Sequence, residues 1–567
     1  MESVPIPFRD HATRRLRAIL LWVLSLSIPL LLWLPIASLY GAAISLLWRE
    51  PQQWLGAIAL DSVARVLLSN TLALAALSCA FALLFGLPIG VALARGPKYF
   101  GRVGLVLCVL PLALPPTVLT TAYLQWTQTP PALAQSSLGA STSTTLAPVF
   151  IAALVLGLCF YPIVALVVRA SLRSMPRQWE EAALQFGPLT SVWRHVLGPH
   201  IRPAIWGALG IVAALAIWEV GAPDLLGVPT YSMQIRRQLA ARDALDASGA
   251  DIKAALSGWP MFVLGGLALW PVLRARGQLG GMAQEATRES SAQSTLDGRW
   301  CVWPSLLIFA ICPLAPIAVF VSQLRPPQVL WETWTANSGE IASTVLSATL
   351  ATLLCLLLSL MMVSLSRNQS TLRRCGLSAS GALMLVAPVL LGIALIQFYN
   401  RPGWEWIYGG GDGSDSLQSL LMDWSSRYSL LIVGYLSRFL PLALWWFDEA
   451  ANRVDNTLLE AAQNLGAPPA RVTRTILLPY LTPVVIGGGA LLWSLCAGEL
   501  ATSILVNAPG GQTLPVPIFN WMHIGAIEQV AALSLALFIL NVLALLLGQF
   551  LFALLIKPRG TGNPHHD

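Results

Sequence analysis

The chain has 567 residues, of which 56% are hydrophobic and only 11% are charged, and its formal net charge at pH 7 is +7. A soluble domain carries about 25% charged residues, so this chain has too few to cover a globular surface in water. Lipid must cover most of it. No globular part is available to carry a basic face for nucleic acid.

Apolar runs long enough to cross a bilayer core recur from one end of the chain to the other. They predict an all-α polytopic membrane protein with about twelve transmembrane helices, arranged as two tandem sets of six. The predicted spans lie near residues 17–47, 66–94, 103–125, 147–170, 203–221 and 257–275, and then near 302–321, 341–365, 376–399, 428–447, 483–506 and 530–556.

The two sets define two halves, residues 1–276 and 300–567. Residues 277–299 lie between them and are rich in Gly, Ser, Gln and charge. Such a composition is typical of a flexible linker.

One hydrophilic segment occurs twice. Residues 181–187 read Glu-Ala-Ala-Leu-Gln-Phe-Gly, and residues 460–466 read Glu-Ala-Ala-Gln-Asn-Leu-Gly. Similar tails follow, but the second copy has one residue more between its Gly and the next repeated Pro. Other polar and Pro positions repeat at offsets of 272–280 residues: Thr71/Thr344, Pro116/Pro388, Gln125/Gln397, Phe160/Phe439, Pro162/Pro441 and Glu219/Glu499. This slow drift indicates a tandem duplication with small insertions.

The orientation follows from the positive-inside bias of cytoplasmic loops. Basic clusters such as Arg14/Arg15, Arg95/Lys98 and Arg373/Arg374 place both termini, the linker and both repeated loops (176–203 and 455–483) in the cytoplasm. Arg236 and Arg237 are the exception, because this topology puts them outside.

Each repeated loop is predicted to form a short helix, a glycine turn and a second short helix. Glu180 and Glu181 suit the positive N-terminal end of the first helix, and Gly187 or Gly466 suits a left-handed turn at its end. Val192, Val196 and Leu197 share one face of the next helix. The loop is therefore expected to be a rigid docking element on the membrane surface.

These residues resemble the EAA motif of ABC importer permeases, the membrane subunits of binding-protein-dependent uptake systems with the type I fold. The resemblance covers nearly the whole chain and implies that each motif is a coupling helix seated in a groove of a cytoplasmic ATPase. The residues that match the motif are Glu181, Ala182, Ala183 and Gly187, and Glu460, Ala461, Ala462 and Gly466. With its two halves fused in one chain, the sequence is most similar to the permeases of ferric-iron, thiamine and phosphonate uptake systems.

The chain has three lysines, Lys98, Lys253 and Lys557, and none completes a phosphate-binding loop. We therefore expect no enzyme activity, no bound cofactor and no metal in this chain. ATP and Mg would be used by a separate ATPase, expected to be a homodimer. The resemblance also implies a periplasmic or lipid-anchored binding protein and the bacterial inner membrane. Ferric iron is the favoured solute, with thiamine and phosphonates open.

Glu219 and Glu499 occupy equivalent positions in the fifth predicted span of each half. Acids within a span are costly and usually face a cavity or a partner. They are candidates for a shared translocation path, or each makes a structural hydrogen bond at a helix break. Pro116 and Pro388 are candidates for a gate in the third spans, although a packing role is favoured.

Two other kinds of protein were considered. A secondary transporter driven by an ion gradient can also have two parallel six-helix repeats, but it gives the repeated loops no role. A membrane scaffold without transport activity leaves the paired acids in the fifth spans unexplained.

Overall fold

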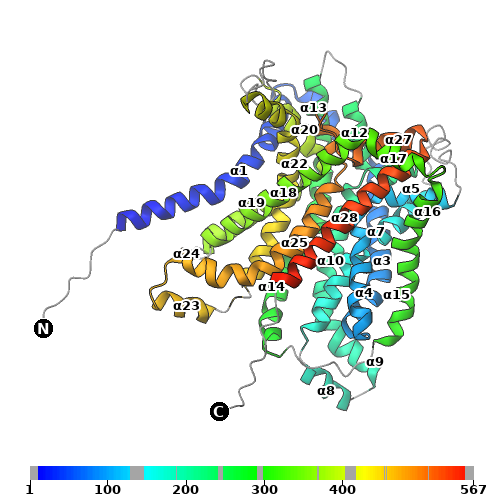
Figure 1. The fold of residues 1–567 in the computed structure, drawn as a ribbon. Coiled ribbons are helices and arrows are strands. Elements are labelled where there is room, and N and C mark those ends of the chain that lie inside the picture. The colour runs from blue at the N-terminus through cyan, green and yellow to red at the C-terminus, as the bar shows by residue number, and fades with distance from the viewer. Residues whose placement is uncertain are drawn as a thin grey trace, which may run out of the picture.

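The computed structural model describes residues 11–127, 146–175, 177–186, 188–240, 247–289, 298–366, 370–401, 417–452, 454, 456–508 and 510–555. Within these residues, helices are the only regular secondary structure. They form one elongated bundle, from which α1 extends to one side (Figure 1).

The helices follow the same order in each half. In the first half they are α1 (His11–Arg49), α2 (Pro51–Ile58), α3 (Ser62–Arg95), α4 (Lys98–Val109), η1 (Leu110–Ala113), α5 (Pro116–Trp126), α7 (Leu146–Arg173), α8 (Arg177–Phe186), α9 (Leu189–Val192), η2 (Trp193–Leu197), α10 (Gly198–Trp218), α11 (Gly221–Leu225), α12 (Tyr231–Ala240), α13 (Ala247–Ser257) and α14 (Trp259–Glu289). In the second half they are η3 (Arg299–Cys301), α15 (Val302–Phe309), η4 (Ala310–Leu314), α16 (Ala315–Gln323), α17 (Gln328–Ala336), α18 (Ser338–Ser366), α19 (Ser370–Leu383), α20 (Pro388–Tyr399), α22 (Leu417–Asn452), α23 (Asn456–Asn464), α24 (Pro469–Val472), η5 (Thr473–Leu477), α25 (Leu478–Ala497), α26 (Ser503–Val506), α27 (Pro515–Ile524) and α28 (Ile527–Leu555).

Nine helices in the described residues are long and apolar enough to cross a membrane, and three bent helix pairs bring the number to twelve if each pair is one span. The predicted all-α polytopic fold is therefore confirmed. The residue boundaries between the two halves stay a prediction.

The third span of each half is broken, whereas the sequence predicts continuous helices at 103–125 and 376–399. The chain turns by 95° before Pro116 and by 98° before Pro388. A proline disfavours helical geometry in the residue before it, and both preceding residues are indeed non-helical, with ψ values of 145° at Pro115 and 137° at Ala387.

Two other elements differ from their predicted bounds. The fifth spans begin at Trp193 and Arg474, about ten residues before their predicted starts, because the second short helix of each repeated loop runs straight into the span. Residues 277–289 of the predicted linker continue α14 as helix; this stretch contains the helix formers Leu, Met, Ala, Gln and Glu. Residues 290–297 lie outside the described part.

The first span of each half packs on the other half. Helix α1 lies against α18, α19 and α20, while α15 lies against α3 and α4 and α16 lies against α5. Trp33 donates its indole N–H to the carbonyl of Ala379 at 2.8 Å, and in the reverse direction Tyr123 donates to the carbonyl of Ile311 at 3.2 Å. The first span of each half is thus exchanged, in the sense that it packs on the other half, and this packing joins the halves over much of their length.

Helices α3 and α7 pack at backbone contact through glycines. A Cβ added at Gly86 would lie 2.7 Å from the carbonyl oxygen of Tyr161, and one added at Gly90 would lie 2.7 Å from Cβ of Val168. Small residues let membrane helices approach closely where no hydrophobic effect drives them together.

The repeated threonines hold equivalent connections. Thr71 Oγ1 accepts the N–H of Tyr231 at 3.0 Å, where α12 begins, and Thr344 Oγ1 accepts the N–H of Leu514 at 2.8 Å, just before α27. Both side chains are fully buried. The duplication therefore preserves a hydrogen bond that anchors a short helix in each half.

Gly86→Val tests the close packing of α3 on α7. We expect a destabilisation of about 1–3 kcal/mol, the usual cost of overpacking, measured as a lower midpoint of thermal unfolding in detergent. The control is Gly266→Val in α14, where an added Cβ meets no atom within 4 Å. Equal midpoints for the two variants would contradict this packing.

Candidate functional site

The two repeated loops lie at the same end of the bundle. Helices α8 and α23 are at the lower end in Figure 1, opposite to α12, α13 and α27 at the upper end. Both are short helices that connect two spans and run outside the bundle. We call the first end the α8–α23 end.

The second loop turns at Gly466, which has a φ of +76°, a conformation that glycine adopts without strain. The N–H of Ala467 bonds the carbonyl of Ala462 at 3.0 Å, which closes the end of α23. The equivalent Gly187 lies outside the described residues.

The one-residue difference between the copies is confined to this turn. Pro188 accepts the N–H groups of Ser191 and Val192, and Pro468 accepts those of Arg471 and Val472. The same two bonds recur at an offset of 280 residues, so the extra residue is Ala467. After it the geometry of the two copies is the same.

The motif residues divide into an exposed set and a packed set. Glu181, Ala182 and Ala461 are exposed, whereas Ala183 and Ala462 are half-buried and pack on the membrane bundle. The side chain of Glu460 lies outside the described part of the chain, although its backbone belongs to α23.

Each short helix also exposes a large apolar side chain at the same repeat position. Trp179 on α8 is 49% exposed, and Leu458 on α23 is 47% exposed. Each belongs to a helix whose average composition is polar or neutral. A single exposed apolar residue is common on a protein surface, but its recurrence at the same position of both copies favours a binding role for the two helices.

The loops connect rigidly to the fifth spans. Helix α9 continues through the π-helical turn η2 into α10, and α24 continues through η5 into α25. The predicted apolar face is buried in both copies, through Val192 and Leu197 in one and Val472 and Leu477 in the other. A displacement of either loop would therefore be transmitted along a helix to its far end.

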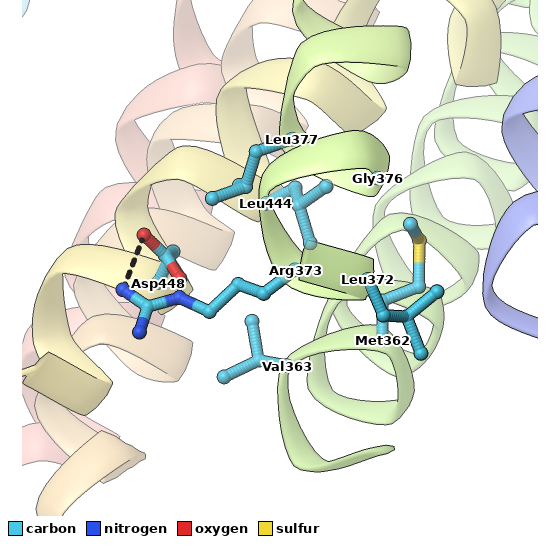
Figure 2. Close-up of a pocket in the computed structure, with 8 residues that line it drawn as sticks. All are labelled: Met362, Val363, Leu372, Arg373, Gly376, Leu377, Leu444 and Asp448. Atoms are coloured by element: carbon cyan, nitrogen blue, oxygen red, sulfur yellow. Dashed lines mark hydrogen bonds and ion pairs between the residues drawn. The ribbon is translucent and has the colours of Figure 1, made fainter. Parts of the chain in front are cut away.

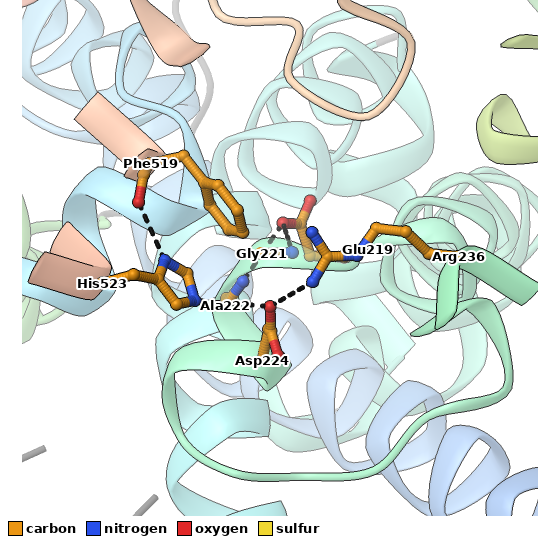
Figure 3. Close-up of polar contacts among 7 residues, drawn as sticks. All are labelled: Glu219, Gly221, Ala222, Asp224, Arg236, Phe519 and His523. Carbon is orange, nitrogen blue, oxygen red and sulfur yellow. Dashed lines mark hydrogen bonds and ion pairs between the residues drawn. The ribbon is translucent and has the colours of Figure 1, made fainter. Parts of the chain in front are cut away.

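Glu219 and Glu499 lie at that far end, where each fifth span breaks. Glu219 Oε1 accepts the N–H of Gly221 at 3.1 Å and that of Ala222 at 3.4 Å (Figure 3). Glu499 Oε1 accepts the N–H of Thr502 at 3.0 Å. Each carboxylate thus accepts backbone N–H groups at or just before the start of the short helix that follows the break, α11 or α26.

The broken third spans meet these same breaks. Helix α5, which begins at Pro116, packs on α11, and α20, which begins at Pro388, packs on α26. A Cβ added at Gly498 would lie 3.2 Å from Pro115, and one at Gly221 would lie 3.3 Å from Leu500. The structure therefore gathers Glu219, Glu499 and the Pro115–Pro116 break where the two halves meet.

Arg438 makes this arrangement asymmetric, and the sequence analysis missed it. It forms an ion pair with Glu499 and lies within electrostatic reach of Glu219 from the other half. Its counterpart in the first half is Cys159, at the offset of 279 residues shared by Phe160 and Phe439. A lone arginine inside the predicted span 428–447 was the signal that could have found it.

A second polar cluster joins the halves near this break. Asp224 accepts a hydrogen bond from Arg236 at 2.5 Å and lies 3.6 Å from His523 Nε2 of the other half (Figure 3). His523 Nδ1 lies 2.9 Å from the carbonyl of Phe519, and Arg236 lies 5.2 Å from the Phe519 ring centre. Asp224 thus neutralises Arg236, one of the two arginines that depart from the positive-inside pattern.

His523 predicts a pH dependence of stability. Its hydrogen bond with Asp224 raises the pKa of His523 above its ordinary value near 6.5. The imidazolium therefore stabilises the fold at low pH, and this stabilisation is lost as the pH rises through the raised pKa. The midpoint of thermal unfolding should fall as the pH rises above about 6.5, the ordinary pKa of histidine, in the wild type but not in His523→Gln.

Asp224→Asn is the control, because it removes the partner and should abolish the difference between wild type and His523→Gln. The difference should be small, since the His523 side chain is 45% exposed. Identical pH profiles for wild type and His523→Gln would show that this contact does not contribute.

Comparisons with known proteins agree with this architecture. The family model described as "Binding-protein-dependent transport system inner membrane component" matches residues 356–557. The molybdenum transport system permease protein ModB of Haemophilus influenzae is 30% identical over 184 residues, 32% of this chain and 77% of that protein. No solved structure matches the chain.

Two further relatives are more distant in sequence. The Fe(3+)-transport system permease protein FbpB 2 of Haemophilus influenzae is 22% identical over 394 residues, 68% of this chain and 72% of that protein. The spermidine/putrescine transport system permease protein PotC of Escherichia coli is 27% identical over 133 residues, 24% of this chain. The chain spans about half the length of PotC, 49%. By the family model and the ModB match, this chain belongs to the family of binding-protein-dependent transport system inner membrane components.

Proposed function

We propose that this chain is the membrane-spanning permease of a bacterial ATP-binding-cassette importer in the inner membrane. The observation that carries the proposal is the pair of equivalent short helices, α8 and α23, at one end of the bundle. Each exposes an apolar side chain and is followed by a second short helix, α9 or α24, that continues into a fifth span. This arrangement suits two ATPase subunits that bind side by side and move both spans together.

In this proposal the α8–α23 end and both termini are cytoplasmic, and a periplasmic or lipid-anchored binding protein delivers solute to the opposite end. ATP and Mg are used by the ATPase dimer, and this chain binds neither. Nucleotide changes the state of the dimer, and the docked helices shift the permease between inward-open and outward-open states.

The translocation path is proposed to pass where the halves meet at the breaks of the third and fifth spans. Broken helices within a membrane are tolerated where they line a cavity or are buried in protein, and Glu219 and Glu499 accept backbone N–H groups at the breaks of the fifth spans. The residues assigned to this path are Glu219, Glu499, Pro116 and Pro388.

Ferric iron is the proposed solute. Support comes from the match to the Fe(3+)-transport permease FbpB 2. This match covers 394 residues, which is longer than either half of this chain and therefore includes parts of both halves. The other relatives are named for molybdenum and for spermidine/putrescine, so molybdate, spermidine and putrescine belong in the same uptake assay, as do thiamine and a phosphonate.

The combined variant Trp179→Glu/Leu458→Glu tests the docking surface. Loss of a buried apolar anchor at an interface costs about 2 kcal/mol or more, so retention of the co-purifying ATPase should fall by more than tenfold. Binding-protein-stimulated ATP hydrolysis should fall with it. The thermal midpoint of the permease should fall only slightly, because about half of each side chain is exposed, although Trp179 also packs on His200.

Ile524→Glu is the matched control, since Ile524 is 78% exposed on α27 at the opposite end. It should leave the ATPase bound. Charge reversal of the motif acids, Glu181→Lys/Glu460→Lys, should reproduce the loss. Full ATPase retention in both double variants would overturn the assignment of α8 and α23.

Replacement of Glu219 and Glu499 separates a path role from a structural one. In Glu219→Gln the amide oxygen can still accept the N–H groups of Gly221 and Ala222, so the fold should survive while uptake falls if the charge faces the path. Glu499→Gln also leaves Arg438 without its ion-pair partner, so it should lower both the thermal midpoint and uptake. Unchanged uptake kinetics in Glu219→Gln would make Glu219 a structural residue.

The energy source distinguishes this function from secondary transport. Uptake into vesicles supplied with ATP should persist when an ionophore collapses the proton gradient. Uptake that stops with the gradient and ignores ATP would establish a secondary transporter.

A further inference from the structure

The second half holds a buried ion pair at the α8–α23 end of its bundle. Arg373 on α19 donates to both carboxylate oxygens of Asp448 on α22, at 2.5 and 3.2 Å, and to Asn452 at 2.5 Å. Figure 2 shows the arginine reaching across a small pocket to Asp448, between Val363 and Leu377. The Asp448 side chain is only 4% exposed. This charge is therefore satisfied within the protein.

The first half changes every member of this group. The offset of 279 residues, which pairs Pro162 with Pro441, places Arg169 opposite Asp448 and Arg173 opposite Asn452. The offset of 272 residues, which pairs Pro116 with Pro388, places Gly101 opposite Arg373. The acidic residue Asp448 thus corresponds to the basic residue Arg169 in the first half. The arginine side chain that pairs with Asp448 has no counterpart there, because position 101 is glycine.

The structure shows that the space at Gly101 is open. A Cβ added there would meet only the carbonyl oxygen of Leu93, at 4.0 Å. Arg173 donates to that same carbonyl at 3.4 Å. A side chain at position 101 could therefore extend from α4 without a clash, as the Arg373 side chain extends from α19 in the second half. The first half has glycine at this position and hence no such side chain.

Arg169 lacks a counter-charge among the residues that the structure describes. It is half-buried, its Nε has no hydrogen-bond partner, and the charge that acts on it most is the like charge of Arg173. The C-terminal end of α7 favours cations, but it provides no acceptor for this Nε. A partly desolvated guanidinium in this position requires an anion with oxygen acceptors.

We propose that Arg169 and Arg173, with the space at Gly101, form a binding site for the phosphodiester head group of an anionic phospholipid. Guanidinium groups bind phosphate oxygens through two parallel hydrogen bonds. Both arginines lie within the last five residues of α7, at the end of the candidate membrane span Ala147–Arg173. That depth is the level of the lipid head groups, and basic pockets between membrane helices are known to bind them.

The site is built in one half only. In the orientation of the proposed function, the head group comes from a lipid of the cytoplasmic leaflet. It would occupy the position in the first half that the Arg373 side chain occupies in the second half. Lipid binding would stabilise the contact between α4 and α7, as the Arg373–Asp448 pair stabilises that between α19 and α22. The assignment does not depend on which solute is transported.

The test compares the full-length chain in nanodiscs of phosphatidylglycerol and of phosphatidylcholine. The readouts are the midpoint of thermal unfolding and the phospholipid retained on the protein, measured by native mass spectrometry. The wild type should be more stable in phosphatidylglycerol and should retain it. Arg169→Gln/Arg173→Gln should weaken retention about fivefold for each arginine, the ratio that corresponds to about 1 kcal/mol per basic residue at an anionic surface.

The variant Gly101→Arg/Arg169→Asp/Arg173→Asn rebuilds the second-half ion pair in the first half. It should fold and lose the preference for phosphatidylglycerol. Arg373→Gln is the matched control; it should lower the midpoint equally in both lipids and leave the preference intact.

Two results would overturn the proposal. One is a preference for phosphatidylglycerol that is the same in the wild type and in both first-half variants. The other is full stabilisation of the wild type by millimolar inorganic phosphate in phosphatidylcholine, which would assign the site to a free anion.

Discussion

The constraint on which this structure depends is that a helix broken inside a bilayer must satisfy its own backbone, because no water is available there. Each fifth span of this chain breaks, and the glutamate at the break, Glu219 or Glu499, accepts the N–H groups of the short helix that follows. Each third span also breaks, at Pro116 or Pro388, and packs on that short helix. Each half therefore contains two helix breaks that pack on one another, and the break in each fifth span is held by polar contacts, which can rearrange more readily than a continuous helix.

The surrounding helices give these breaks a mechanical connection to the α8–α23 end. Helices α9–η2–α10 and α24–η5–α25 run without interruption from the repeated loops to Glu219 and Glu499. The exchanged first spans, α1 and α15–α16, hold each half against the other. In the proposed cycle, a movement imposed on both loops therefore reaches both breaks together. The Asp224–Arg236–His523 cluster joins the halves beside the break at Glu219.

Much of this could be predicted from the sequence, because a bilayer leaves few solutions for a chain with these apolar runs. The number of spans and the repeat followed from hydropathy and from offsets such as that of Thr71 and Thr344. The 95° and 98° turns could not, since a proline in a span predicts a break but not its angle. Arg438 was visible in the predicted span 428–447, yet its pairing with Glu499 depends on tertiary structure. The exchange of first spans leaves no pattern in the sequence, since lipid-facing and helix-facing apolar residues look alike.

The central claim is that both repeated loops dock ATPase subunits onto a single copy of this chain. The most direct measurement is the intact mass of the complex isolated under mild conditions through a tag on this chain, together with its rate of ATP hydrolysis. The account predicts one copy of this chain with two ATPase subunits, and hydrolysis that rises when the binding protein and its solute are added. A chain that runs alone or pairs only with itself, hydrolyses no ATP and still supports uptake driven by a proton gradient would contradict it.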